Sequence, residues 1–315
     1  MFRLQVLESV DSTNEVIKRA IEDGEPEGLA IRAYRQTGGY GRQGRAWKSP
    51  RGGMYESILL RPEVEMRELP TLALVVAIAV RRALASLVVD DQARRICIKW
   101  PNDVVLVGGD FGVDCSTRDT ALELDGHTPC SDSPALENSP LGCSRRAELR
   151  AAHARQAQGL QASQTNAPSI KSLYSKLAGI SSEVHAGGIC VGIGVNVEPP
   201  EDAIEVGGKN APAYLADLGF GFTCEREAAI NAVGDAVLHE FEPLYRRWCD
   251  VGFAALSGEF AEHSMLEGRF VRMANQLGEV VCEGTVRGVD ASGRLILRLE
   301  DGEAKAVASG EVHLL

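Results

Sequence analysis

Three separated segments of the chain carry the residue types needed to join a carboxylate to a nucleotide. The run Lys99-Trp100-Pro101-Asn102-Asp103 places an amide and a carboxylate close to a lysine. An earlier segment, residues 36–47, combines glycines for close backbone approach with the fixed cations Arg42 and Arg45. A later run, Lys176-Leu177-Ala178-Gly179-Ile180, adds a further lysine. Together these segments predict a site that neutralises a phosphate and a carboxylate while they react.

The glycine-rich segment also fits other descriptions. Residues 39–44, Gly-Tyr-Gly-Arg-Gln-Gly, match the dinucleotide pattern G-x-G-x-x-G, which requires a helix to begin within it. Pro50, Gly52 and Gly53 follow instead, with no apolar helical stripe, so a Rossmann site is disfavoured. The absence of a Gly-Lys-Ser/Thr run argues against a P-loop. The plain alternative is a surface turn, but the two arginines favour a loop that closes over an anion.

Other candidate residues have equally plain alternatives. Trp47 is either a stacking platform for a base or a core tryptophan. Trp100 belongs either to a rigid corner of the site or to a turn with a buried indole. A lone lysine such as Lys176 is usually a solvated surface charge, and it becomes a candidate site residue only because the other two segments accompany it. Gly192 and Gly194, inside a β-rich run, mark either close approach by a ligand or a bulge.

Composition narrows the class of protein. The 315 residues include 33 basic and 44 acidic side chains, a formal charge of −11, which disfavours DNA as a partner. The eight cysteines include no C-x-x-C pair and predict reduced, cytoplasmic thiols. No signal pattern opens the chain, and the longest apolar run, residues 72–80, is too short to span a bilayer. The spacing of His127, Cys130, Cys143 and His153 fits no tight zinc site.

Periodicity predicts the elements that position these residues. Ser12-Thr13-Asn14-Glu15 has the form of a capping box, followed by an apolar helical stripe that ends at Gly24. We expect strands at 29–34, 57–60, 95–100, 104–107 and 188–197, a buried helix over 71–88 and a long helix through 230–248. Residues after about 262 read as short strands of a small β-barrel. Residues 107–174 are polar and of low complexity, which predicts a disordered insertion.

With these residues assembled, the chain resembles the biotin–protein ligases. The match runs over residues 7–106 and 174–315 and agrees in order and spacing. It is carried by Asp11-Ser12-Thr13-Asn14, residues 36–47, Ser49-Pro50 through Tyr55 and Ser57, Lys99–Asp103, Lys176–Ile180 and Gly192–Asn196. The resemblance implies an α+β fold with a central mixed β-sheet flanked by helices, related to class II aminoacyl-tRNA synthetases. It places a catalytic domain at 1–261, interrupted by the 107–174 insertion, and a small C-terminal SH3-like β-barrel at 262–315.

The resemblance also implies an activity. The carboxylate of biotin would attack the α-phosphate of Mg²⁺-bound ATP to give biotinyl-5′-AMP, and a lysine of a biotin carboxyl carrier domain would then take the biotinyl group. Arg42, Lys176 and Asp103 are the implied catalytic residues, and no metal ligand is assigned. The implied binding residues are Ser12, Thr13, Asn14, Gln36, Gly39, Tyr40, Gly41, Arg42, Arg45, Trp47, Lys99, Asn102, Lys176, Gly179, Ile180, Gly194 and Asn196.

The chain departs from that family in two places. Tyr40 stands where the family often has arginine, and about 65 residues replace a tight hairpin before Lys176. Nothing before residue 7 resembles a helix-turn-helix, so we expect a ligase without a DNA-binding domain. The resemblance further implies a cytoplasmic protein without membrane contact, and it leaves a homodimer open. The alternatives are a lipoate-type ligase, a non-catalytic biotin or adenylate sensor, and an SH3-like peptide adapter.

Overall fold

The computed structural model describes residues 1–41, 44, 46–108, 173–200, 212–221, 225–275 and 277–315. Arg42 and Arg45 therefore lie outside the described residues. So does the expected insertion, apart from the two residues at each of its ends.

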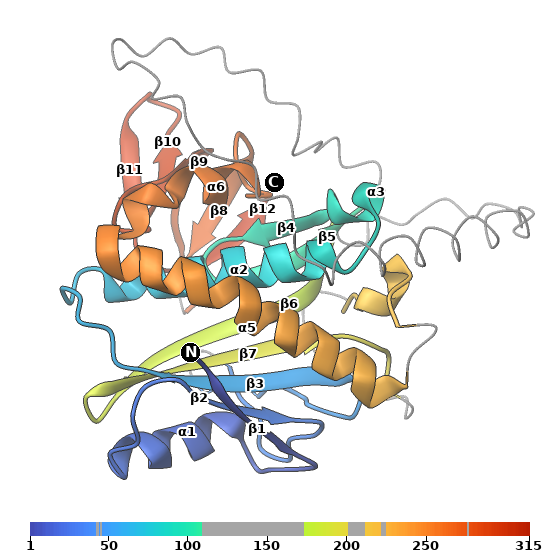
Figure 1. Ribbon diagram of the computed structural model, residues 1–315. Helices are drawn as coiled ribbons and strands as arrows, with labels where there is room; N and C mark the ends of the chain where they lie inside the picture. The colour runs from blue at the N-terminus through green and yellow to red at the C-terminus, as the bar shows by residue number, and fades with distance from the viewer. Residues whose placement is uncertain (42–43, 45, 109–172, 201–211, 222–224, 276) are drawn as a thin grey trace, which may run out of the picture. The chain divides into compact units, whose positions relative to one another are not determined.

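A seven-stranded mixed sheet forms the centre of the fold (Figure 1), in the order β1-β2-β3-β7-β6-β5-β4. Its strands are β1 (Arg3–Leu7), β2 (Leu29–Ala33), β3 (Gly53–Leu60), β4 (Ile96–Lys99), β5 (Asp103–Val107), β6 (Tyr174–His185) and β7 (Gly188–Asn196). β1 pairs with β2 in parallel, and every other pair is antiparallel. The mixed sheet expected from the resemblance is thus present, and it brings the ends of β5, β6 and β7 side by side.

Helices cover both faces of this sheet. Helix α1 (Thr13–Glu22) packs Ile17 and Ile21 against Leu59 and Cys190 on one face. Helices α2 (Leu72–Ser86) and α5 (Arg226–Val251) cover the other face, where the alternate side chains of β3 and β7 point. Residues 69–86 are long and apolar enough to cross a membrane, but most of them are buried in this core. The shorter helices are η2 (Leu69–Thr71), α3 (Asp90–Ala93), η3 (Leu215–Leu218), η4 (Phe253–Ala255) and α6 (Ser257–Glu262).

A buried ion pair lies between the sheet and α5. Arg32 Nε is 2.7 Å from Glu56 Oε2, and Arg32 Nη1 is 3.0 Å from Asp235 Oδ1 on the helix. Both Arg32 and Glu56 are fully buried. Gly234 makes this possible, because a Cβ there would lie 2.3 Å from the guanidinium group. A glycine in the middle of α5 therefore serves close packing.

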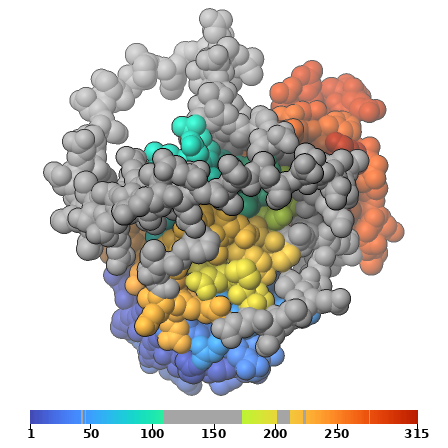
Figure 2. All heavy atoms as spheres, turned by 90° about the vertical axis from the view of Figure 1, so that its right-hand side faces the viewer, coloured from blue at the N-terminus to red at the C-terminus, as the bar shows by residue number. Residues whose placement is uncertain are grey.

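The C-terminal residues form a separate antiparallel sheet, in the order β11-β10-β9-β8-β12. Its strands are β8 (Phe270–Ala274), β9 (Val280–Val289), β10 (Leu295–Arg298), β11 (Ala304–Val307) and β12 (Glu311–Leu314). Gly293 and Gly302 lie in turns between these strands, with φ of 73° and 86°. Figure 2 shows this sheet as a group of its own on one face. Trp100 links the two sheets: its buried indole donates a hydrogen bond from Nε1 to Gly293 O at 2.9 Å.

The predicted capping box makes neither of its two hydrogen bonds. The helix begins at Thr13 with Ser12 as its N-cap residue, but the Ser12 side chain makes no capping hydrogen bond. The amide of Thr13 donates instead to Gln36 Oε1 at 2.8 Å. Glu15 does not reach back either, because its carboxylate accepts a hydrogen bond from Tyr40 at 2.6 Å. Side chains from the glycine-rich segment thus replace the local cap and tie α1 to that segment.

Candidate functional site

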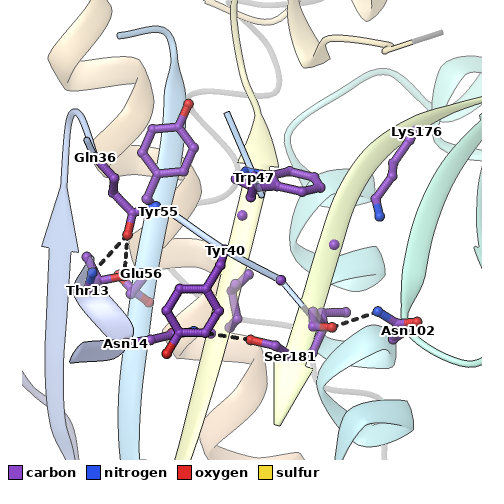
Figure 3. Close-up of a pocket in the computed structure, with 16 residues that line it drawn as sticks. Thr13, Asn14, Gln36, Tyr40, Trp47, Tyr55, Glu56, Asn102, Lys176 and Ser181 are labelled. Atoms are coloured by element: carbon purple, nitrogen blue, oxygen red, sulfur yellow. Dashed lines mark hydrogen bonds between the residues drawn. The ribbon is translucent and has the colours of Figure 1, made fainter. Parts of the chain in front are cut away.

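A pocket open to solvent lies over the sheet where β3, β7 and β6 meet (Figure 3). Its residues come from the three segments that the sequence singled out, together with α1, β3, β7 and the continuation of β6. The lining residues are Thr13, Asn14, Gln36, Tyr40, Gly41, Trp47, Tyr55, Glu56, Asn102, Lys176, Gly179, Ile180, Ser181, Gly192, Ile193 and Gly194. Segments more than 70 positions apart in sequence, such as those of Asn102 and Lys176, therefore converge as predicted.

Glycines on neighbouring strands form the floor of the pocket. Gly179 on β6 and Gly194 on β7 are paired in the sheet register. A Cβ at Gly194 would lie 2.9 Å from Trp47 Nε1, and a Cβ at Gly179 would lie 3.1 Å from Trp47 Cζ3. Only glycine lets the indole approach the strands this closely. Within the described residues Trp47 Nε1 is buried without a hydrogen-bond partner, so the platform reading of Trp47 fits better than the core reading.

One end of the pocket is polar and pre-organised. Gln36 Oε1 accepts hydrogen bonds from the amide and the hydroxyl of Thr13, at 2.8 and 3.0 Å, and Gln36 Nε2 donates to Ser49 Oγ at 2.9 Å. Ser57 Oγ lies 2.7 Å from Thr13 Oγ1 and 2.6 Å from Asn14 Oδ1. These neutral donors and acceptors hold one another in place before any ligand arrives.

Sequence reasoning did not select Ser49, Ser57 or Ser181 as site residues. Ser181 lies 3.5 Å from Asn14 Nδ2 and extends the polar end across to β6. A signal for Ser57 was available, because it is a fully buried hydroxyl inside the otherwise apolar end of β3. The other two serines become visible only once the strands are paired.

The opposite end carries the charges. Lys176 Nζ lies 2.7 Å from Asp103 Oδ1 and 4.9 Å from the centre of the Trp47 ring. Asn102 Nδ2 donates to Ile180 O at 2.7 Å, and Asn196 Nδ2 donates to Lys176 O at 3.0 Å. These two amides fix the backbone of β6 on either side of the site. An ammonium group held between a carboxylate and an indole face is placed to meet an anion at the mouth of the pocket.

The structure divides the candidate site residues into those that line the pocket and those that do not. Thr13, Asn14, Gln36, Tyr40, Gly41, Trp47, Asn102, Lys176, Gly179, Ile180 and Gly194 line the pocket, whereas Ser12, Gly39, Lys99, Asp103 and Asn196 do not. Gly39 packs beneath the polar end, where a Cβ would lie 2.5 Å from Ser49 Oγ. Lys99 Nζ lies 5.5 Å from the centre of the Tyr174 ring, and burial lowers its pKa. Lys99 therefore reaches the site only through its strand partner Asp103.

Comparisons with known proteins agree with this geometry. Residues 6–112 match the model of the biotin/lipoate A/B protein ligase family, and residues 268–315 match that of the biotin protein ligase C-terminal domain. The bifunctional ligase/repressor BirA of Bacillus spizizenii is 35% identical over 100 residues, 31% of this chain and 30% of that protein. The biotin–[acetyl-CoA-carboxylase] ligase of Paracoccus denitrificans is 38% identical over 105 residues, 33% of this chain and 42% of that protein. These matches thus span well under half of either relative.

Longer but weaker similarity extends over the whole chain. The biotin–[acetyl-CoA-carboxylase] ligase of Mycobacterium tuberculosis is 24% identical over 319 aligned positions, covering 99% of this chain and 89% of that protein. The solved biotin protein ligase from Aquifex aeolicus, in complex with biotin and ATP, superposes with a TM-score of 0.63 at 23% identity, over 100% of this chain and 99% of that one. That superposition establishes the shared fold. Residues 6–112 and 268–315 are thus similar, in that order along the chain, to the biotin/lipoate A/B protein ligase family and to the biotin protein ligase C-terminal domain.

Proposed function

We propose that the chain is an ATP-dependent biotin–protein ligase acting on a carrier domain of a biotin-dependent carboxylase. The observation that carries this proposal is the polarity of the pocket. Hydrogen-bonding groups around Thr13 and Gln36 stand at one end, Trp47 lies over the glycine floor, and Lys176 stands at the other end (Figure 3). Biotin has the same sequence of parts: a neutral ureido ring, an apolar chain and a carboxylate.

The first step joins that carboxylate to ATP. One carboxylate oxygen attacks the α-phosphorus, the bond to the β-phosphate oxygen breaks, and pyrophosphate leaves. Both reactants are anions, so the ammonium of Lys176, held 2.7 Å from Asp103, serves to lower their mutual repulsion. Arg42, which lies outside the described residues, is proposed to hold the phosphate of the adenylate.

Mg²⁺ fits this site as a companion of the nucleotide. Among the described residues no group of three His, Cys, Asp or Glu side chains could hold a metal ion. Bound with ATP, Mg²⁺ would offset phosphate charge, with phosphate oxygens and water as most of its ligands. Asp103 is the nearest carboxylate to the reacting end and, with Asn102, is the proposed protein contribution to its position.

The second step transfers the biotinyl group. A lysine amine of the carrier attacks the acyl carbon of the mixed anhydride, the bond to the phosphate oxygen breaks, and AMP leaves. The chain must meanwhile keep water from the same carbon, and Trp47, packed within about 3 Å of where a Cβ on Gly179 or Gly194 would stand, covers that part of the pocket. Among the described cysteines, Cys97, Cys190, Cys249 and Cys282 form no disulfide, which agrees with the proposal of a reducing cytoplasmic setting.

A lipoate-type ligase is the second candidate, since the matched family includes lipoate ligases. Its substrate has a disulfide ring without amide groups. The buried polar groups of Thr13, Asn14 and Ser57 would then face a ring that cannot pair with them, which costs binding free energy. The polar end of the pocket therefore favours biotin. A non-catalytic sensor would have no need for the Lys176–Asp103 pair.

Transfer of labelled biotin to a purified carrier domain, with ATP, tests the proposal. We expect Lys176→Met to slow formation of the adenylate and Arg42→Ala to speed its loss. Lys305→Met, which alters a lysine in the C-terminal sheet bonded to Val281 O, is the control and should transfer normally. Transfer of lipoate in place of biotin would favour the second candidate. Unaltered transfer in both site variants would refute the assigned roles.

A further inference from the structure

Tyr40 is held by charged side chains that the proposed reaction does not use. Its hydroxyl donates a hydrogen bond to Glu15 Oε1 at 2.6 Å and accepts one from Lys18 Nζ at 2.7 Å. Lys18 Nζ also lies 2.6 Å from Glu183 Oε2 and 5.1 Å from the centre of the Tyr40 ring. Two carboxylates and one ammonium group therefore fix the phenol in a single position.

This charged cluster lies just beyond the polar end of the pocket. Lys18 follows Asn14 by one helical turn on α1, so the two side chains share a face. Glu183 follows Ser181 by two residues on β6, so these two also share a face. Asn14 and Ser181 line the pocket, whereas Lys18 and Glu183 do not. Tyr40 lines the pocket, whereas Glu15 and Lys18, which bond its hydroxyl, do not.

The hydroxyl of Tyr40 remains a donor throughout the neutral range. Burial, and after it the hydrogen bond to Glu15, raises the pKa of Tyr40 to about 12. The same hydrogen bond lowers the pKa of the Glu15 carboxyl, which stays ionised. A protonated phenol between a carboxylate and an ammonium group forms charge-assisted hydrogen bonds, which are stronger than neutral ones.

Resting on the proposed function, we propose that Tyr40 closes the polar end of the pocket and limits the size of the ring that the chain accepts. Glu15, Lys18 and Glu183 hold this wall in place. Arginine, which the biotin–protein ligases often have here, has no acceptor to offer Lys18 and would place a second cation beside it. Tyr40 is therefore a specificity-determining residue that distinguishes this chain from the pattern it resembles.

The test compares kcat/KM for biotin with kcat/KM for biotin methylated on a ureido nitrogen, in ATP-dependent adenylate formation by the full chain. The methyl group weakens hydrogen bonding equally in every variant, so the ratio reports the room at the end of the pocket. We expect Tyr40→Ala to reduce the preference for biotin about tenfold, the usual effect of one methyl group in a confined site. An unchanged ratio in Tyr40→Ala overturns the proposal.

Tyr40→Phe distinguishes the role of the Tyr40 ring from that of the hydrogen bonds that hold it in place. The ring remains, so the preference ratio should stay, but biotin should dissociate about tenfold faster because hydrogen bonds to charged groups are lost. Lys18→Met should have a similar effect. The effect in the double variant should be smaller than the sum of the two single effects, since both changes remove the hydrogen bond between Lys18 and Tyr40. Tyr34→Phe, which removes a hydroxyl bonded to Asn231 at 2.8 Å, is the control. Additive effects in the double variant would contradict the coupling.

The two proposals fail in different ways. If the wild-type chain forms no biotinyl adenylate, the proposed function is refuted and the role of Tyr40 in it falls as well. If the wild-type chain activates biotin but Tyr40→Ala leaves its preference for the unmethylated ring intact, only the inference about Tyr40 is refuted.

Discussion

Lys176, Gln36 and Ser57 are ordinary residue types whose surroundings decide what they do. The sequence could select Lys176 only because other candidate segments accompany it, and in the fold Lys176 contacts Asp103 and the Trp47 ring. Gln36, expected among the binding residues, lines the pocket, and its carboxamide also bonds Thr13 and Ser49. These bonds hold other polar groups in position, which no sequence pattern reveals.

Ser57→Ala tests the polar end of the pocket. Removing the hydroxyl leaves Asn14 and Thr13 each short of one buried contact, so we expect the free energy of unfolding to fall by about 1–3 kcal/mol. The KM for biotin should rise about tenfold with little change in kcat, since Ser57 positions Thr13 and Asn14, whose proposed contacts with the substrate persist throughout the reaction. Steady-state kinetics and denaturant unfolding measure both. Ser86→Ala, at the end of α2, is the matched control, and an unchanged KM would contradict the account.

Whole helices and strands were predictable where burial requires apolar residues over a long or regularly spaced run. β7 and α2 lie within two residues of their expected bounds because their apolar runs are long. β1 and β12 were not predicted as strands, since they have only five and four residues and β1 is an exposed edge strand whose alternating Leu4 and Val6 are not buried. The floor of the pocket depends on register, which pairs Gly179 with Gly194, and register is set by long-range pairing that the local sequence does not encode.

Gly194→Ala tests that floor. The added methyl group would lie 2.9 Å from Trp47 Nε1, so the indole must move away from the strands. We expect biotin to bind at least tenfold more weakly by calorimetry, while the melting temperature changes little because the indole lies at an open pocket. Gly258→Ala, where a Cβ would meet nothing within 4 Å, should bind normally. Normal affinity in Gly194→Ala would show that Trp47 does not need this floor.

The buried pair of Arg32 on β2 and Glu56 on β3 predicts a pH effect on stability. Burial raises the pKa of Glu56 to about 7 from its ordinary value of 4.5, although Arg32 opposes the shift. The folded state then holds a proton that the unfolded state releases, so this carboxyl makes stability fall as pH rises from 4.5 to 7. The slope is at most about 1.4 kcal/mol per pH unit for one proton.

Glu56→Gln should remove that slope, which is read from the difference between the two unfolding curves across this pH range. Exposed Glu300 serves as the control, since Glu300→Gln should leave the pH dependence of unfolding as it is in the wild type. If Glu56→Gln and the wild type depend on pH identically, Arg32 keeps Glu56 ionised throughout.

At the scale of the molecule, the convergence of the segments on one site was predicted, but the strand pairing that brings them together was not. The described residues form two sheets, and Trp100 connects them by its hydrogen bond to Gly293. Their assignment to a catalytic and a C-terminal domain stays a prediction. The boundary at residue 261 and the insertion at 107–174 stay predictions. The chain nevertheless leaves and re-enters the described fold at one place, because Val107 pairs with Tyr174 and Gly108 N–H donates to Leu173 O at 3.3 Å.

That adjacency makes the segment between Gly108 and Leu173 removable. Replacing residues 109–172 by a two-residue Asn-Gly turn should join β5 to β6 as a hairpin. Since loop closure entropy changes slowly with length, we expect the shortened chain to be at least as stable as the full chain and to transfer biotin at a similar rate. Thermal unfolding and labelled transfer check this. A folded but inactive deletion would show that the segment takes part in function.

The central claim is that Lys176 and the pocket behind it activate biotin with ATP before any carrier arrives. Rapid-mixing measurement of pyrophosphate release, with biotin and ATP but no carrier, tests it most directly. We predict a burst of about one pyrophosphate per wild-type chain that requires biotin, and a rate lowered about 100-fold in Lys176→Met. A burst that is independent of biotin, or one that is equally fast without the lysine, would contradict the account.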